Sequence, residues 1–351
     1  MEGTAMSKPV VTLVVPCYNE EEILPHTIDV LHALIKEYIE DELISDRSRI
    51  LFVDDGSSDS TWPLIYKASI HTETIRGLKL ARNAGHQNAL LAGLYSAKTV
   101  SDCVISLDAD LQDDVNVIRV FIEKFMEGFD VVYGVRRKRD SDTFFKKFTA
   151  QSFYKLMDKM GVPLIYNHAD FRLMSKRALE ALERFDEVNL FLRGIVPLIG
   201  FPSTSVYYDR KERLAGETKY PLKKMLNFAF NGITSFSVTP IRFVMLTGCA
   251  FFFTSLLFLC YFLTLKFFGE TEIGWTSLIT SIWLIGGLQL MAIGLIGEYI
   301  GKVYQESKRR PKYIVDIDLL NFIQQKSTAS ISDEINAKLF DHSVGGQNSA
   351  E

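Results

Sequence analysis

Three clusters of polar and acidic side chains follow apolar runs in the first third of the chain. They occupy residues 16–20, 54–59 and 108–113. Asp108 and Asp110 are two positions apart in an expected loop, so both carboxylates can face the same ion. Hard oxygen ligands of this kind suit Mg²⁺ or Mn²⁺. A divalent ion here would neutralise a diphosphate and stabilise it as a leaving group.

The first two clusters could hold a nucleoside. Tyr18 could stack on a base, and Glu20 could accept a hydrogen bond from a ribose hydroxyl. Asp54 and Asp55 end an apolar run, where burying a carboxylate is costly unless it has a partner. The alternative is that Ser57, Ser58 or Asp59 simply caps the following helix. The chain has no GxxxxGK[ST] and no GxGxxG after a strand, which disfavours a P-loop ATPase or a dinucleotide oxidoreductase. Together, the clusters suit a nucleotide diphospho-sugar.

The elements that position these clusters are expected to alternate between strands and helices. Short, β-branched apolar runs predict buried strands at residues 10–15, 49–53, 77–80, 104–107 and 130–133. Amphipathic stretches at 20–38 and 85–97 predict helices between them. This alternation predicts an α/β, Rossmann-like domain with a mostly parallel sheet. Ligands bind beyond the carboxyl ends of such strands, and all three clusters lie there.

Composition narrows the class of protein. A net charge of −4 argues against a protein that binds nucleic acid through a positive electrostatic potential over its whole surface. With 47% hydrophobic residues, disorder throughout the chain is excluded. The four cysteines show no CxxC spacing and no Cys/His cluster, so we expect buried free thiols. The N-terminus has no signal-peptide pattern, so we expect the first half in the cytoplasm.

Two apolar stretches without charges, 243–265 and 275–297, predict a membrane hairpin. Each is long enough to cross a hydrocarbon core of about 30 Å as a helix. Lysines and arginines lie on both outer flanks, whereas the short connector holds one Lys and two Glu. The positive-inside rule therefore predicts a multi-pass protein of the cell membrane with both termini cytoplasmic. The tail beyond about residue 326 is expected to be mobile.

Several motifs, which follow one another along residues 8–315, resemble those of a known family. Three of them resemble the family 2 glycosyltransferases of the GT-A fold: Val15-Pro16-x-Tyr18-Asn19-Glu20, Val53-Asp54-Asp55-Gly56-Ser57-x-Asp59 and Leu107-Asp108-Ala109-Asp110-Leu111-Gln112-Asp113. Four more narrow the resemblance: Arg82-Asn83-x-Gly85-His86-Gln87, Asp170-Phe171-Arg172-Leu173-Met174, Phe191-Leu192-Arg193-Gly194 and Arg213-x-x-Gly216-Glu217-Thr218-Lys219-Tyr220. With the hairpin, the chain looks like a polyprenyl-phosphate glycosyltransferase, similar to bactoprenol glucosyltransferases and, more distantly, dolichol-phosphate mannose synthases. One departure is that many relatives have Pro where Asp113 or Asp114 stands.

The resemblance implies how the donor is held. Asp110 and Gln112 would bind the metal, with Asp108 near the ribose or the metal. The nucleoside pocket would be lined by Pro16, Tyr18, Glu20 and Asp55.

The resemblance also implies phosphate contacts and a catalytic carboxylate. Arg136, Arg213 and Lys219 would meet phosphate, because Arg binds it bidentately and Lys supplies a point charge. Asp170 corresponds to the general base of other family 2 enzymes. A lipid phosphate is already anionic at pH 7, however, so Asp170 could instead orient Arg172 or the sugar, and positioning would carry the catalysis. The role of His86, in packing or in function, stays open.

Two basic amphipathic stretches, about 144–160 and 221–240, are expected to lie in the headgroup plane of the membrane, with core packing as the alternative. We therefore expect a cytoplasmic GT-A catalytic domain at 8–220, which includes the first of these stretches. This domain is expected to be followed by a juxtamembrane helix at 221–240, by two membrane helices within 241–301, and by a basic segment with a tail at 302–351.

The expected activity is inverting transfer of a hexose, with glucose favoured, from a UDP-sugar to undecaprenyl phosphate at the cytoplasmic face of the membrane. The resemblance also implies a flippase and a second glycosyltransferase downstream, in the modification of a cell-surface polymer. A homo-oligomer is expected, with a tetramer suggested by the family. Two alternatives stay open: another donor sugar (N-acetylglucosamine, galactose or mannose), or a non-catalytic nucleotide-sugar-binding adaptor. A processive synthase is disfavoured, because it would need more spans and a QxxRW motif, and the sequence has neither.

Overall fold

The structure is a computed structural model that describes residues 8–137, 168–185, 187, 192–209 and 275–320, with scattered positions between 241 and 264. The expected interfacial stretches at 144–160 and 221–240 lie outside the described residues, as do Arg213, Lys219 and the tail beyond 320. Cys17 and Cys103 are buried free thiols, as expected, and the other two cysteines lie outside the described residues.

The described residues form one eight-stranded sheet in the order β7-β5-β6-β4-β1-β2-β3-β8. Its strands are β1 (Val11–Cys17), β2 (Arg49–Asp54), β3 (Ile75–Leu80), β4 (Cys103–Ser106), β5 (Val131–Arg136), β6 (His168–Ser175), β7 (Ser203–Tyr208) and β8 (Val315–Asp318). Strands β1 to β4 are mutually parallel, and β5 is parallel to β7, whereas β6 and β8 run antiparallel to their neighbours. The expected mostly parallel sheet is therefore confirmed.

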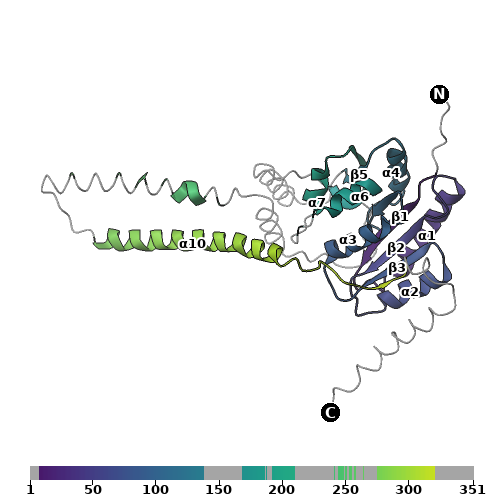
Figure 1. Cartoon of the computed structure of the whole chain (residues 1–351), viewed down its shortest axis with the longest axis horizontal. Helices are drawn as coiled ribbons and strands as arrows, with labels where there is room; N and C mark the ends of the chain where they lie inside the picture. The colour runs from purple at the N-terminus through teal and green to yellow at the C-terminus, as the bar shows by residue number, and fades with distance from the viewer. Residues whose placement is uncertain are drawn as a thin grey trace, which may run out of the picture.

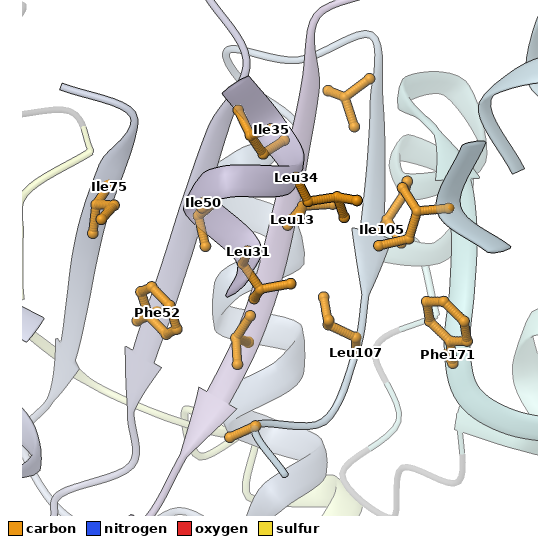
Figure 2. Close-up of a cluster of buried hydrophobic side chains, with 14 of the residues drawn as sticks. Leu13, Leu31, Leu34, Ile35, Ile50, Phe52, Ile75, Ile105, Leu107 and Phe171 are labelled. Atoms are coloured by element: carbon orange, nitrogen blue, oxygen red, sulfur yellow. The ribbon is translucent and has the colours of Figure 1, made fainter. Parts of the chain in front are cut away.

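Helices cover both faces of the sheet, because successive residues of the central strands point to opposite faces and are buried on each. On one face, Leu13 and Phe52 pack with α1 (Leu24–Glu40), α2 (Thr61–His71) and α4 (Val117–Met126). Figure 2 shows side chains of α1 lying across those of the strands on this face. On the other face, Val14 and Leu51 pack with α3 (His86–Ala97), α6 (Lys176–Glu183) and α7 (Leu192–Ile195), which η1 (Val196–Ile199) continues.

The five predicted strands are confirmed as β1 to β5 within a few residues. Three strands were not predicted, and two of them matter for the architecture. Strand β6 inserts antiparallel between β4 and β5, and β8 adds an antiparallel edge to β3 from the far end of the chain. Backbone bonds on either side of β8, from Ala81 to the Ile314 carbonyl and from Leu319 to the Gly77 carbonyl, fasten this edge at 2.9 Å each.

Helix α10 (Trp275–Ser307) projects away from the α/β domain, and the chain then returns to the sheet as β8 (Figure 1). The expected second membrane segment, 275–297, falls within this helix, whereas most of the first, 243–265, lies outside the described residues. Among the helices of the described part of the chain, none combines the length and the hydropathy needed to span a bilayer.

Candidate functional site

The loops that follow β1 and β2 are bound to each other by side-chain to backbone hydrogen bonds. The Asn19 amide donates to Ser57 Oγ at 3.0 Å, and the Ser58 amide donates back to Asn19 Oδ1 at 2.9 Å. The Glu20 amide donates to Thr61 Oγ1 at 2.9 Å. These reciprocal bonds satisfy loop amides that would otherwise lack partners and hold the two loops as one unit at the carboxyl edge of the sheet.

Three of the predicted nucleoside contacts lie on or next to this unit. Pro16 is buried within β1, opposite Val53, while Tyr18 directly follows the strand and is 48% exposed. Glu20 is partly buried at the start of the α1 turn. Tyr18 thus presents a large ring to solvent where a base would stack, and the roles of all three residues stay predictions.

Asp55 organises the next loop of the edge. Its side chain is 2% exposed, and its two oxygens accept from the Ala84 amide at 2.7 Å and the Gly85 amide at 3.0 Å. Burial raises the pKa of Asp55, and the two backbone donors oppose that rise. Gly85 has φ of +91° and precedes α3, so this carboxylate sets where α3 begins and where its first residue, His86, stands.

The acidic loop at residues 108–113 is held at its beginning by α1. Thr27 Oγ1 donates to the Ala109 carbonyl at 2.7 Å, in a buried position. Leu111 has φ of +47°, a left-handed conformation that is costly for a leucine and is retained only where the surroundings enforce it. The Gln112 amide then donates to Asp110 Oδ1 at 3.3 Å. The loop therefore has a defined shape.

The residues of this loop fit a hard divalent cation that substrate oxygens would help to ligate. The Gln112 side chain is 3% exposed, and its buried Nε2 has no hydrogen-bond partner. Exchanging the amide oxygen and nitrogen would place an oxygen ligand there instead. Partial desolvation raises the pKa of Asp108, and nearby carboxylates add to that rise, so a cation would relieve repulsion. Within the described residues, no three His, Cys, Asp or Glu side chains form a metal site by themselves.

A second charged cluster lies beside this loop on the α3 face of the sheet. Asp170, 13% exposed, accepts from Arg172 Nη2 at 2.7 Å on Oδ1 and from Arg193 Nη2 at 3.1 Å on Oδ2. Burial alone would raise the pKa of Asp170, but the two guanidinium groups outweigh it and hold that pKa well below its usual range. His86 Nε2 lies 3.8 Å from Asp108 Oδ1 and 3.9 Å from Asp170 Oδ2, so it bridges the two clusters.

Arg136, predicted to meet phosphate, has a protein partner. Its Nε and Nη2 donate to the two oxygens of Asp113 at 3.0 and 3.2 Å, and Tyr208 Oη donates to Asp113 Oδ1 at 2.7 Å. Asp113 is 6% exposed, and these hydrogen bonds compensate the charge of its buried carboxylate. These bonds anchor the far end of the acidic loop to the ends of β5 and β7. A phosphate contact of Arg136 stays a prediction.

The structure brings the predicted Asp108, Asp110, Gln112 and Asp170 to the same edge of the sheet. It adds Arg193, which belongs to the Phe191-Leu192-Arg193-Gly194 motif and for which the sequence predicted no role. The motif could have marked Arg193 as a candidate site residue. Its partner could not be predicted, because Arg193 and Asp170 are 23 positions apart in the sequence and meet only in the folded protein. The partnership of Asp113 with Arg136 and Tyr208 also went unpredicted.

Comparison with known proteins shows which family the chain resembles. The model of the family described as Glycosyl transferase family 2 matches residues 12–183. The chain is 63% identical to "Uncharacterized glycosyltransferase YkoT" of Bacillus subtilis (strain 168), over 90% of this chain and 94% of that protein. It is 41% identical to "Bactoprenol glucosyl transferase" of Shigella phage SfV, over 87% of this chain and 97% of that protein.

These matches define an enzyme that transfers sugars. The chain belongs to the family 2 glycosyltransferases and, within them, to the bactoprenol glucosyltransferase group. Among solved structures, glucosyl-3-phosphoglycerate synthase from Mycobacterium tuberculosis is similar with a TM-score of 0.40 and 17% identity, over 64% of this chain and 78% of that one.

Proposed function

We propose that the chain is an inverting, metal-dependent transferase that moves a hexose, with glucose favoured, from a UDP-sugar to undecaprenyl phosphate. The observation that carries the proposal is the acidic loop at residues 108–113, anchored at both ends, beside the interlocked loops that follow β1 and β2. Relatives named bactoprenol glucosyl transferase support the same acceptor class.

The donor would lie across the carboxyl edge of the sheet. Its nucleoside would contact the groups predicted for it, which are Pro16, Tyr18, Glu20 and Asp55. The structure supports Asp55 best as the residue that shapes this pocket, because both of its oxygens already accept backbone hydrogen bonds. Asp108, Asp110 and Gln112 would hold Mg²⁺ or Mn²⁺, which when bound supplies charge neutralisation to the departing diphosphate.

The transfer needs little proton chemistry from the protein. A phosphate monoester is ionised at neutral pH, so a phosphate oxygen can attack C1 of the sugar directly, and this single displacement inverts the anomeric centre. Asp170 then acts best as a fixed carboxylate that orients Arg172 and Arg193, as its depressed pKa and two ion pairs support. Arg136, Arg213 and Lys219 remain proposed phosphate contacts, and positioning carries the catalysis.

We further propose that the enzyme is a multi-pass protein of the cell membrane with its catalytic domain and both termini in the cytoplasm. The charge-free segments 243–265 and 275–297 and their basic outer flanks support this arrangement. Exposed apolar side chains along α10, among them Leu278, Leu290 and Ile300, suit contact with lipid. We also propose that the stretches 144–160 and 221–240 lie at the membrane interface and that the enzyme is a homo-oligomer. A flippase and a second glycosyltransferase would then use its product.

The experiment is a panel of radiolabelled UDP-sugars, with GDP-mannose included, offered to the purified full chain with undecaprenyl phosphate and Mg²⁺ or Mn²⁺. We expect label from one donor to enter the lipid phase, and Asp110→Ala to abolish it. Nucleotide binding without transfer from any donor would contradict the proposal and favour a nucleotide-sugar-binding adaptor.

A further inference from the structure

Arg193 lies at the exposed end of the charged cluster around Asp170. It comes from α7, and the Gln87 side chain ties the start of this helix to α3 by accepting from the Leu192 amide at 3.4 Å. Asp170 then fixes the guanidinium, since its Oδ1 accepts from Arg193 Nε at 3.4 Å and its Oδ2 accepts from Arg193 Nη2 at 3.1 Å. The side chain of Arg193 is nevertheless 35% exposed, so a ligand can reach it.

The two arginines of the cluster differ in their access to solvent. Two guanidinium groups face the single carboxylate of Asp170, and one of them, Arg172, is only 1% exposed. The Nε and Nη1 atoms of Arg172 are buried without a hydrogen-bond partner. Arg172 donates to Asp170 Oδ1 from inside the protein, and the exposed end of the cluster is Arg193. An anionic ligand could therefore approach the guanidinium of Arg193 but not that of Arg172.

The position of this positive group complements the metal loop. His86 lies within 4 Å of carboxylate oxygens of both Asp108 and Asp170, so a single side chain separates the metal loop from the cluster. A donor diphosphate held at Asp108 and Asp110 would repel a second phosphate that approached C1 of the sugar. The cation of Arg193, which is paired with Asp170, would offset that repulsion and orient the incoming phosphate.

We propose that Arg193, positioned by Asp170, binds the phosphate of the polyprenyl-phosphate acceptor. This inference rests on the proposed function and names the group that receives its second substrate. In the step that follows, an electron pair on a phosphate oxygen of the acceptor forms the bond to C1. The bond from C1 to the β-phosphate oxygen breaks, and its electron pair leaves with UDP, so no proton has to be removed. Asp170 is then a positioning residue.

The test separates the two substrates kinetically. Purified full-length protein in detergent is assayed with undecaprenyl phosphate and with the UDP-sugar that it transfers, each varied in turn. We expect Arg193→Gln to raise the KM for undecaprenyl phosphate at least tenfold while the KM for the donor stays within twofold. Arg193→Lys keeps a charge without the two-pronged geometry, so we expect an intermediate acceptor KM.

The matched control is Arg177→Gln. Arg177 makes the same kind of pair, with Nε 2.7 Å from Asp130 Oδ1, but it does so at the opposite edge of the sheet. We expect both of its KM values to stay within twofold of the wild type. Thermal unfolding of each variant checks that it is folded, and if Arg193→Gln is inactive, the same comparison is read from Arg193→Lys.

The outcomes distinguish this inference from the proposed function. If the wild type transfers sugar but the Arg193 variants raise the donor KM as much as the acceptor KM, or change neither, Arg193 does not bind the acceptor and the inference fails alone. If the wild type transfers no sugar to undecaprenyl phosphate from any donor, the proposed function fails first.

Discussion

The anchor of the acidic loop at Asp113 can be tested by removing a single oxygen atom. Tyr208 is 3% exposed, and its hydroxyl donates to the buried Asp113 carboxylate at 2.7 Å. Tyr208→Phe deletes this donor and leaves the ring packed edge-on against Phe171, whose centroid lies 5.5 Å away. The side chain keeps its shape, so the perturbation is confined to one hydrogen bond.

The magnitude follows from the charge of the acceptor. A hydrogen bond to an ionised group contributes about 1.5–3 kcal/mol, and Asp113 retains its two bonds from Arg136. We therefore expect Tyr208→Phe to lower the free energy of unfolding by about 2 kcal/mol. For a domain of this size, that corresponds to a fall in Tm of about 4–8 °C.

The assay is thermal unfolding of the full chain at a fixed detergent concentration and scan rate. The matched control is Tyr207→Phe, because Tyr207 is the preceding residue of the same strand but is 56% exposed. Its stability should change by no more than about 0.5 kcal/mol. A double-mutant cycle with Asp113→Asn should give a coupling of about 1 kcal/mol or more. Equal Tm values for the two tyrosine variants, or an additive cycle, would refute the anchoring role.

Two further predictions concern the neighbouring loops and the charged cluster. Gly56→Ala should destabilise the protein by more than about 2 kcal/mol, because φ is +68° and the new Cβ would lie 2.6 Å from backbone atoms of Arg82 and Asn83. Gly128→Ala, with φ of +101° but nothing within 4 Å, is its control in thermal unfolding and should cost less. The two arginines hold the pKa of Asp170 in the folded protein below its ordinary value of 3.8. The ion pairs of Asp170 therefore contribute fully to the free energy of unfolding above pH 3.8, and this contribution is lost only as the pH falls through the lower pKa of the folded state. The pH profile of kcat/KM should therefore show no ionisation of Asp170 between pH 5 and 8, and an inflection there that disappears in Asp170→Asn would identify a general base instead.

The central strands and the polar ends that carry the site could be predicted because both are local features of the sequence. A β-branched run such as residues 49–53 reports burial on both faces, and parallel strands bring their carboxyl ends to one edge. The positions of Asp108, Asp110 and Gln112 follow from that rule alone.

The remaining contacts depend on pairings between distant segments, which the local pattern does not encode. Strand β8 is four residues long, carries two aspartates and pairs across more than 200 positions with β3. Arg193 reaches Asp170 only because β6 inserts antiparallel between β4 and β5 and α7 packs against the start of α3. Asp113 likewise meets Arg136 and Tyr208 only after β5 and β7 pair.

The most direct measurement is the lipid product itself. The purified full chain is incubated with undecaprenyl phosphate, UDP-glucose and Mn²⁺, and the extracted lipid is analysed by mass spectrometry while released UDP is quantified. The account predicts undecaprenyl phosphate that has gained one hexose, one UDP released for each glycolipid formed, and loss of both products with EDTA or in Asp110→Ala. Release of UDP without a glycolipid, or formation of the glycolipid by the Asp110→Ala variant at the wild-type rate, would contradict it.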